Sequence, residues 1–276
     1  MQILRLIKLL RLQKWDNYLN FVEKMDASGF APLVVCDDEK LSATTAESLF
    51  TPCSLHFELR EKYNLDEVAG DGDSFSKAKN LMQWLTNHTC YNGASKAWNP
   101  DDSLAILDYS FDKGFKRAIC CREKAIILTD MLISLGLKAY PLCMRSIRDG
   151  DNHFTMRFYC EEQDKWIMLD PSFNVTFMLN GEPLDVYEVR QAFLEGKDVE
   201  LTGYNFNNTK KCQEIYKQGF IKQCLSKLST WNDCSMDRRK KGKRYDWTKK
   251  KEFRTELLNN IRMNVKSGHP IGFKTL

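Results

Sequence analysis

The sequence predicts an α+β fold in which one helix packs on an antiparallel β-sheet, with additional helices at both ends. The helix is indicated by apolar residues that recur with helical period between residues 121 and 135. The sheet is indicated by two segments, 153–159 and 166–170, in which apolar and polar residues alternate with the period of a strand. Helical patterns before and after this centre predict the additional helices.

Composition places the chain among ordinary globular proteins. Its 276 residues are 43% hydrophobic, which is enough to bury a large core. The opening "MQILRLIKLLRLQKW" is apolar, but Arg5, Lys8 and Arg11 interrupt it before a signal sequence or a membrane span could form. We therefore expect an amphipathic helix at the N-terminus, no membrane association and a cytoplasmic location.

Ten cysteines are scattered along the chain without the regular spacing of a disulfide framework, and no two of them form a C-x-x-C pair. Cys212, Cys224 and Cys234 lie too far apart in the sequence for a zinc knuckle. We expect reduced thiols, no structural metal and no cofactor.

Positive charge is concentrated near the C-terminus. Residues 238–254 hold ten Lys/Arg against two Asp/Glu, so this segment carries +8 and the rest of the chain −4. Tyr245 and Trp247 within it could stack on the bases of a nucleic acid. A solvated loop and helix face is the commoner role of such a segment, so nucleic acid is not the expected partner.

One cluster of glycine and aspartate, at residues 69–74, divides the chain most clearly. It predicts an N-terminal lobe, residues 1–70, packed on a core of residues 71–200. A basic, helical extension of residues 201–276 follows. Within the core, residues 74–88 place apolar side chains on one helical face behind a serine cap, and residues 101–114 form a second helix.

The central helix begins at two adjacent cysteines, Cys120 and Cys121. Apolar residues follow Cys121 at steps of four, three, four and three as far as Leu135, and Gly136 supplies the C-terminal stop. Cys121 is therefore expected in line with the buried face of the helix. Cys120 is rotated by about 100° from that face and is expected at or before the cap, as a bystander.

The two alternating segments predict a β-hairpin whose register follows from matching the apolar faces. This pairs Phe154 with Leu169 and leaves the four-residue loop 160–163. In that register His153 lies directly opposite Asp170. Side chains paired across strands are close enough for a hydrogen bond between an imidazole and a carboxylate.

Other elements hold no obvious catalytic cluster. Residues 138–146 predict a further strand, and the dipeptide Asn180-Gly181 predicts a tight turn. Residues 185–196 have the spacing of a capping box followed by a helix, and a last helix is expected at about 213–228.

Three residues in this arrangement favour thiol chemistry. A cysteine in the first turn of a helix faces the positive end of the helix dipole, which favours the thiolate of Cys121. A nearby imidazole, His153, would favour it further, and Asp170 would fix the tautomer of that imidazole. The sequence therefore predicts a nucleophile, a base and an orienting carboxylate, in that order along the chain.

Each residue also has a structural interpretation, because cysteines on apolar helix faces and single histidines on strands are usually core residues. His88 is an alternative base, although its place at the end of a helix suits a cap. A second donor for a developing oxyanion, beside the N–H of Cys121, is left open among Asn152, Asn92, Trp84 and Trp98.

The span from about Ser74 to Asn174 resembles the transglutaminase-like superfamily. Its first motif is matched by Cys121 with an alanine four residues later and a glycine fifteen residues later. Its second is matched by His153-Phe154, and its third by the segment 166–174, "WIMLDPSFN". The flanks "LHFELREKYNLDEV" and "NGEPLDVYEVRQAFLEGK" look like those of a bacterial branch.

This resemblance implies a cysteine-proteinase-like core, with a helix bearing Cys121 packed on a sheet bearing His153 and Asp170. It implies acyl transfer or hydrolysis of an amide bond in a peptide or protein substrate, through a thioester. The residue after the nucleophile is Arg122, where animal transglutaminases have tryptophan, so crosslinking of that type is not implied. The alternative is an inactive transglutaminase-like binding module.

Overall fold

The computed structural model describes residues 50–93, 102–112, 118–146, 152–203 and 210–230, together with Leu33 and Val35. All of these lie in the first of two compact units, residues 1–241. The predicted N-terminal helix and the basic segment 238–254 fall outside the described residues. The architecture is helices on an antiparallel sheet, so the predicted α+β class is confirmed.

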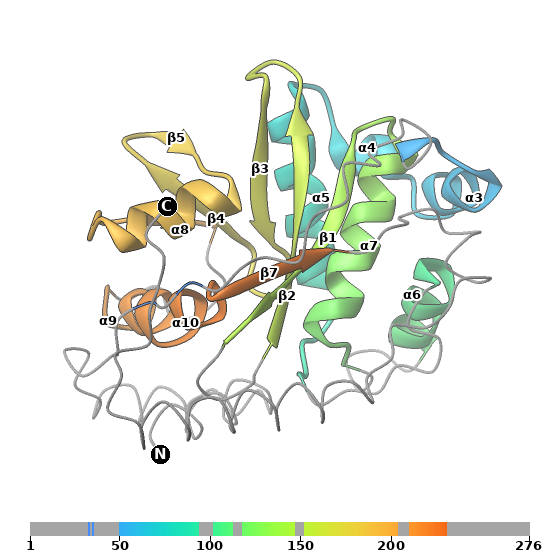
Figure 1. Ribbon diagram of the computed structural model, residues 1–276. Coiled ribbons are helices and arrows are strands. Elements are labelled where there is room, and N and C mark those ends of the chain that lie inside the picture. The colour runs from blue at the N-terminus through green and yellow to red at the C-terminus, as the bar shows by residue number, and fades with distance from the viewer. Residues whose placement is uncertain are drawn as a thin grey trace. The chain divides into compact units, whose positions relative to one another are not determined.

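A seven-stranded sheet forms the centre of the part of the chain that the structure describes (Figure 1). The order is β5-β4-β3-β2-β1-β7, and β6 pairs with β4; all pairings are antiparallel. The strands are β1 (Ala139–Arg145), β2 (Asn152–Cys160), β3 (Lys165–Asp170), β4 (Val175–Leu179), β5 (Glu182–Pro183), β6 (Glu200–Thr202) and β7 (Lys227–Thr230). The predicted strands therefore form, and the tight turn at Asn180-Gly181 joins β4 to β5, with positive φ at both residues.

The predicted register of the β2–β3 hairpin is wrong by two residues. Met156, not Phe154, pairs with Leu169, and the connection is residues 161–164. A shift of two keeps every side chain on its predicted face, because side chains alternate with period two. Asp170 therefore falls opposite Thr155 and is a diagonal neighbour of His153 on the same face.

Helices cover both faces of the sheet. On one side, α7 (Cys121–Ser134) lies against β1 and β2, with α3 (Ser54–Lys62), α4 (Leu65–Ala69), α5 (Ser74–His88) and α6 (Ser103–Asp112) around it (Figure 1). On the other side lie α8 (Val186–Leu194), α9 (Lys210–Glu214), a π-helix (Ile215–Ile221) and α10 (Lys222–Cys224). The predicted boundaries of the N-terminal lobe, the core and the C-terminal extension stay a prediction.

The central helix α7 is buried on all sides rather than along one stripe, since every residue from Glu123 to Ser134 is buried. Neighbouring helices enclose the half of α7 that the sheet does not cover. Two other details differ from the sequence analysis. The cap of α5 is Asp73, whose carboxylate accepts the N–H of Ser76, and the predicted helix 213–228 ends early, because β7 begins at Lys227.

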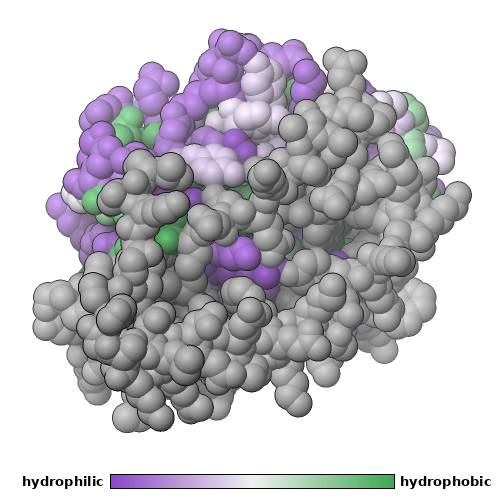
Figure 2. Space-filling view, in the orientation of Figure 1, coloured by the Kyte–Doolittle hydropathy of each residue, from purple (hydrophilic) through white to green (hydrophobic). Residues whose placement is uncertain are grey.

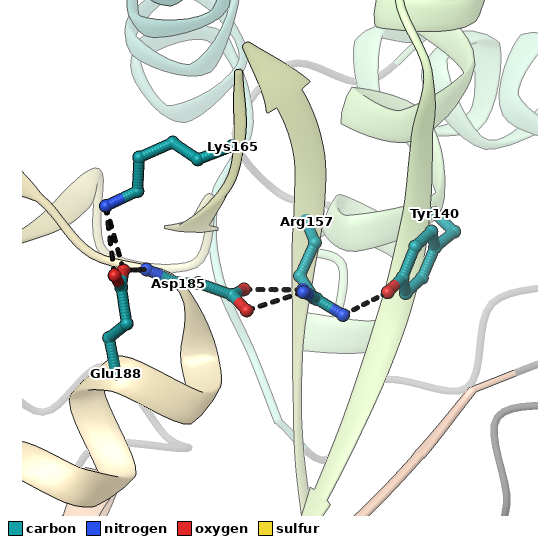
Figure 3. A network of polar contacts seen from close by, with 5 residues as sticks. All are labelled: Tyr140, Arg157, Lys165, Asp185 and Glu188. Atoms are coloured by element: carbon teal, nitrogen blue, oxygen red, sulfur yellow. Dashed lines mark hydrogen bonds and ion pairs between the residues drawn. The ribbon is translucent and has the colours of Figure 1, made fainter. Parts of the chain in front are cut away.

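The polar face of β2 is buried as well, because α8 and the π-helix cover it. Arg157 on this face donates to both carboxylate oxygens of Asp185 and to the hydroxyl of Tyr140 (Figure 3). Asp185 caps α8, and its N–H donates to Glu188, which also pairs with Lys165 on β3 at 2.9 Å. This network joins α8 to three strands of the sheet.

The visible described surface is mostly hydrophilic, with a few small hydrophobic areas (Figure 2). Among the described residues the large hydrophobic side chains that stand exposed are those of Phe57, Tyr187 and Leu194. None of the helices in the described part of the chain combines the length and apolar character that crossing a bilayer requires.

Candidate active site

A histidine and an aspartate meet on the face of the sheet that α8 and the π-helix cover. His153, near the start of β2, places its Nε2 atom 2.7 Å from the Oδ2 atom of Asp170, the last residue of β3. Both side chains are fully buried. Because a carboxylate only accepts, Nε2 carries the proton and donates it to Asp170, which leaves Nδ1 as the basic nitrogen.

Two further donors hold the carboxylate in place. The hydroxyl of Tyr216, in the π-helix, donates to Oδ2 of Asp170 at 2.6 Å, and the N–H of Ser172 donates to Oδ1 at 2.9 Å. Pro171 stops the strand, and the turn that follows brings the Ser172 N–H back toward Asp170. A buried carboxylate with three donors is fixed in orientation.

Aromatic side chains enclose the imidazole. Phe173 stacks on His153 with ring centroids 5.7 Å apart, and Phe220 meets it edge-on at 4.9 Å. The Nδ1 atom is buried and makes no hydrogen bond with any of the residues that the structure describes. An unsatisfied buried nitrogen costs stability.

Cys121 opens α7 and is partly buried, in contact with the hydrophobic clusters on both faces of the sheet. The backbone N–H of Phe154, the residue after His153, hydrogen-bonds to the sulfur of Cys121 and lowers the pKa of this thiol. The nearby negative charge of Asp170 raises that pKa. The structure thus brings the thiol to the start of β2. It does not form a hydrogen bond between Cys121 and the imidazole, because Nδ1 has no partner.

Cys120 is the N-cap of α7, as predicted, but it interacts with Cys121. A hydrogen bond from Cys121 and the backbone N–H groups of Glu123 and Arg122 lower the pKa of Cys120 to about 6, against the effect of burial. The same hydrogen bond, burial and the charge on Cys120 raise the pKa of Cys121 well above its ordinary value. The two sulfurs therefore share one proton, and the first negative charge rests on Cys120.

A buried lysine follows this pair in α7. Lys124 is one turn along α7, fully enclosed, and its Nζ donates to the carbonyl of Thr89 at 3.0 Å. Burial lowers the pKa of Lys124 to about 7, although Cys90 and Asp170 both favour its charged form. Its charge is therefore sensitive to pH in the neutral range.

The candidates for a second oxyanion donor and for an alternative base lie at several places in the fold. Asn152 begins β2, and the N–H of Asn92 donates to the carbonyl of Ile119, two residues before Cys121. Trp84 stacks on His88, whose Nδ1 lies 2.8 Å from the carbonyl of Trp84 on the exposed end of α5. Trp98 falls outside the described residues. Asn92 thus lies beside the segment that leads into α7, and Asn152 is the first residue of β2. His88, by contrast, is the last residue of α5.

Four residues of the site were not predicted from the sequence: Lys124, Phe173, Tyr216 and Phe220. A signal for Lys124 was present, because it lies three residues after Cys121 and four before Leu128, both on the apolar stripe. Tyr216 and Phe220 gave no local signal, since their segment reads as an ordinary helix. Within the described residues no group of three or more potential ligands could hold a metal ion.

The sequence matches no protein-family model and no curated protein. Among solved structures, the chain is similar to one described as a putative cysteine protease from Cytophaga hutchinsonii, with 15% identity and a TM-score of 0.38. That match covers 63% of this chain and 59% of the other. It is also similar to a structure described as a TGase, with 20% identity and a TM-score of 0.31, over 48% of this chain and 34% of the other.

Both descriptions name classes of protein to which the sequence resemblance points. The chain spans only about three fifths and one third, respectively, of these two structures. At TM-scores below 0.5 neither similarity supports an argument about the activity of this chain, which depends on the geometry of its own site.

Proposed function

We propose that the protein catalyses thiol-dependent acyl transfer or hydrolysis of an amide bond in a peptide or protein substrate. Cys121 is the nucleophile, His153 the general base and then acid, and Asp170 the residue that orients His153. The observation that carries this proposal is the buried hydrogen bond from His153 to Asp170, which leaves an unpartnered basic nitrogen on a ring at the start of the strand that contacts Cys121.

In the proposed reaction, Nδ1 of His153 takes the proton of Cys121, and the thiolate attacks the substrate carbonyl to form a tetrahedral adduct. The C–N bond then breaks, His153 returns the proton to the leaving amine, and a thioester on Cys121 remains. Water or an amine attacks this thioester with His153 again as base. The positive end of α7 and the N–H of Cys121 would stabilise the oxyanion.

Tyr216 has a positioning role in this proposal. Its hydroxyl holds the same oxygen of Asp170 that accepts from His153. The carboxylate therefore cannot rotate away when the imidazole becomes charged. The residues of the π-helix thus complete a site whose principal groups lie on α7, β2 and β3.

The test is acylation by p-nitrophenyl acetate, followed by mapping of the acetylated residue. We expect a rapid burst of p-nitrophenolate and a hydroxylamine-sensitive acetyl group on Cys121, and we expect both to be lost in His153→Ala. His88→Ala is the matched control, because His88 is an exposed histidine at a helix end. An acetyl group on Cys120 instead would transfer the nucleophilic role to that residue.

A binding module is the second candidate, and the enclosure of His153 by Phe173 and Phe220 favours it. In such a module no cysteine would react faster with the acylating reagent than the other accessible cysteines. Uniform acylation of the partly exposed cysteines, unchanged in His153→Ala, would support the module and contradict the enzyme.

A further inference from the structure

Two adjacent thiols stand at the start of α7, and the proposed reaction uses only one of them. Cys120 and Cys121 are the only neighbouring cysteines in the sequence; the next closest pair, Cys224 and Cys234, is ten positions apart. The thiol of Cys121 donates a hydrogen bond to the sulfur of Cys120, so the two sulfurs are in contact. Both residues are partly exposed, so a small molecule can reach them.

The backbone holds each of these sulfurs in place. The sulfur of Cys120, the N-cap of α7, accepts the N–H of Glu123 in a capping box. The sulfur of Cys121 accepts the N–H of Phe154, near the start of β2. Because both donors belong to regular secondary structure, the two sulfurs are held side by side before any ligand arrives.

We propose that Cys120 and Cys121 form a binding site for trivalent arsenic compounds, in which both sulfurs bond one arsenic atom. The thiolate of Cys120 attacks the arsenic of a hydrated organic arsenical, R–As(OH)2. An As–S bond forms as an As–O bond breaks, and the leaving hydroxide takes the proton of Cys121 to become water. The thiolate of Cys121 then displaces the second hydroxide into solvent, and no atom changes its oxidation state.

The side-by-side arrangement of the sulfurs favours arsenic over other thiophilic elements. Trivalent arsenic is pyramidal, so its two As–S bonds point to the same side and its organic group takes the third position. Monovalent copper and divalent mercury prefer two sulfurs on opposite sides of the metal, which adjacent sulfurs in contact do not supply. Structural zinc takes four ligands, and the described part of the chain has no group of three or more potential ligands that could hold a metal ion.

The charge of the pair favours the first step. A hydrogen bond from Cys121 and the backbone N–H groups of Glu123 and Arg122 lower the pKa of Cys120 to about 6. Cys120 is therefore mostly a thiolate at pH 7, and the thiolate is the nucleophilic form of the side chain. Cys121, whose pKa is raised, keeps the proton that the leaving hydroxide takes.

Helix capping is the plainer role of Cys120, and a serine at this position separates capping from arsenic binding. Serine is a favoured N-cap residue and keeps an acceptor for the N–H of Glu123, but it has no sulfur. A single remaining thiol bonds arsenic without chelation, so an excess of a competing monothiol removes the arsenic. Two linked sulfurs hold the arsenic more tightly, by about 100-fold or more.

The experiment titrates the full, reduced chain with phenylarsine oxide at pH 7 in excess 2-mercaptoethanol and measures the bound fraction by mass spectrometry of the intact protein. We expect one phenylarsenic group per chain, which 2,3-dimercaptopropanol removes. Cys120→Ser and Cys121→Ser should each raise the apparent dissociation constant about 100-fold or more. Cys53→Ser and Cys90→Ser are the matched controls, because both of these cysteines are also partly exposed, and should leave the constant unchanged.

An unmutated chain that binds no phenylarsenic group would overturn the proposal, and so would unchanged binding in a folded Cys120→Ser or Cys121→Ser protein. Should these variants fail to fold, alkylation of the unmutated protein decides. In the arsenic-bound chain, iodoacetamide should leave Cys120 and Cys121 unmodified while it still modifies Cys53. Alkylation of the pair at the same rate with and without arsenic would also overturn the proposal. None of these readouts depends on the acyl transfer proposed for Cys121.

Discussion

Replacing Asp170 by asparagine tests the proposed site most directly. The carboxylate accepts from His153 at 2.7 Å with both side chains fully buried, so water cannot take its place. An asparagine of the same shape keeps the hydrogen bond from Tyr216 but no longer stabilises a charged imidazole. In the opposite orientation of the amide, the NH2 group would instead donate to Nε2, which would move the ring proton to Nδ1 and remove the proposed base.

The expected magnitude follows from the charge pair. Truncating one partner of a buried, hydrogen-bonded pair costs about 2–5 kcal/mol, which corresponds to about 30- to 5,000-fold. At pH 6 a thiol of ordinary pKa is only about 0.3% ionised, so the change from a fully ionised Cys121 to one of ordinary pKa would lower the rate of alkylation by about 300-fold. A thiolate of lower basicity is also less nucleophilic, which leaves an expected fall of about 10- to 100-fold.

The assay is alkylation by iodoacetamide at pH 6, with the rate at Cys121 followed by mass spectrometry in a Cys120→Ser background. Serine retains the helix cap, and a single thiol then reports from the start of α7. Asp108→Asn is the matched control, because that carboxylate is 54% exposed and pairs with Lys62 at the surface. An unchanged rate at Cys121 in a folded Asp170→Asn protein would refute the proposed role of the His153–Asp170 pair.

Three further outcomes are expected. Cys120→Ser removes the neighbouring charge that raises the pKa of Cys121, so alkylation of Cys121 at pH 7 should become several-fold faster, and a slower rate would contradict the shared proton. Lys124→Met should abolish a rise in the free energy of unfolding between about pH 7 and pH 10, seen by urea titration. The unfolded lysine binds a proton in that range and the folded one does not; a variant that keeps the rise would exclude Lys124 as its source. Arg157→Gln leaves Asp185 buried without its partner and should lower the free energy of unfolding by about 3–5 kcal/mol, with alkylation of Cys121 in the folded protein unchanged.

Local pattern determined much of the fold. The start of α7 at Cys121, the stop at Gly136 and the capping box of α8 follow from residues within one or two turns of one another. The alternation in β2 and β3 likewise assigns His153 and Asp170 to the same face of the sheet. These features are short-range, so the sequence alone contains them.

Only the tertiary structure decided the rest. Registers that differ by two residues present the same faces, so the hydrophobic pattern could not show that Asp170 is diagonal to His153 rather than opposite it. Tyr216 reaches Asp170 from 46 residues further along the chain, and such contacts leave no local periodicity. The burial of both sheet faces, and with it the lowered pKa of Lys124, arises because elements distant in sequence exclude water together.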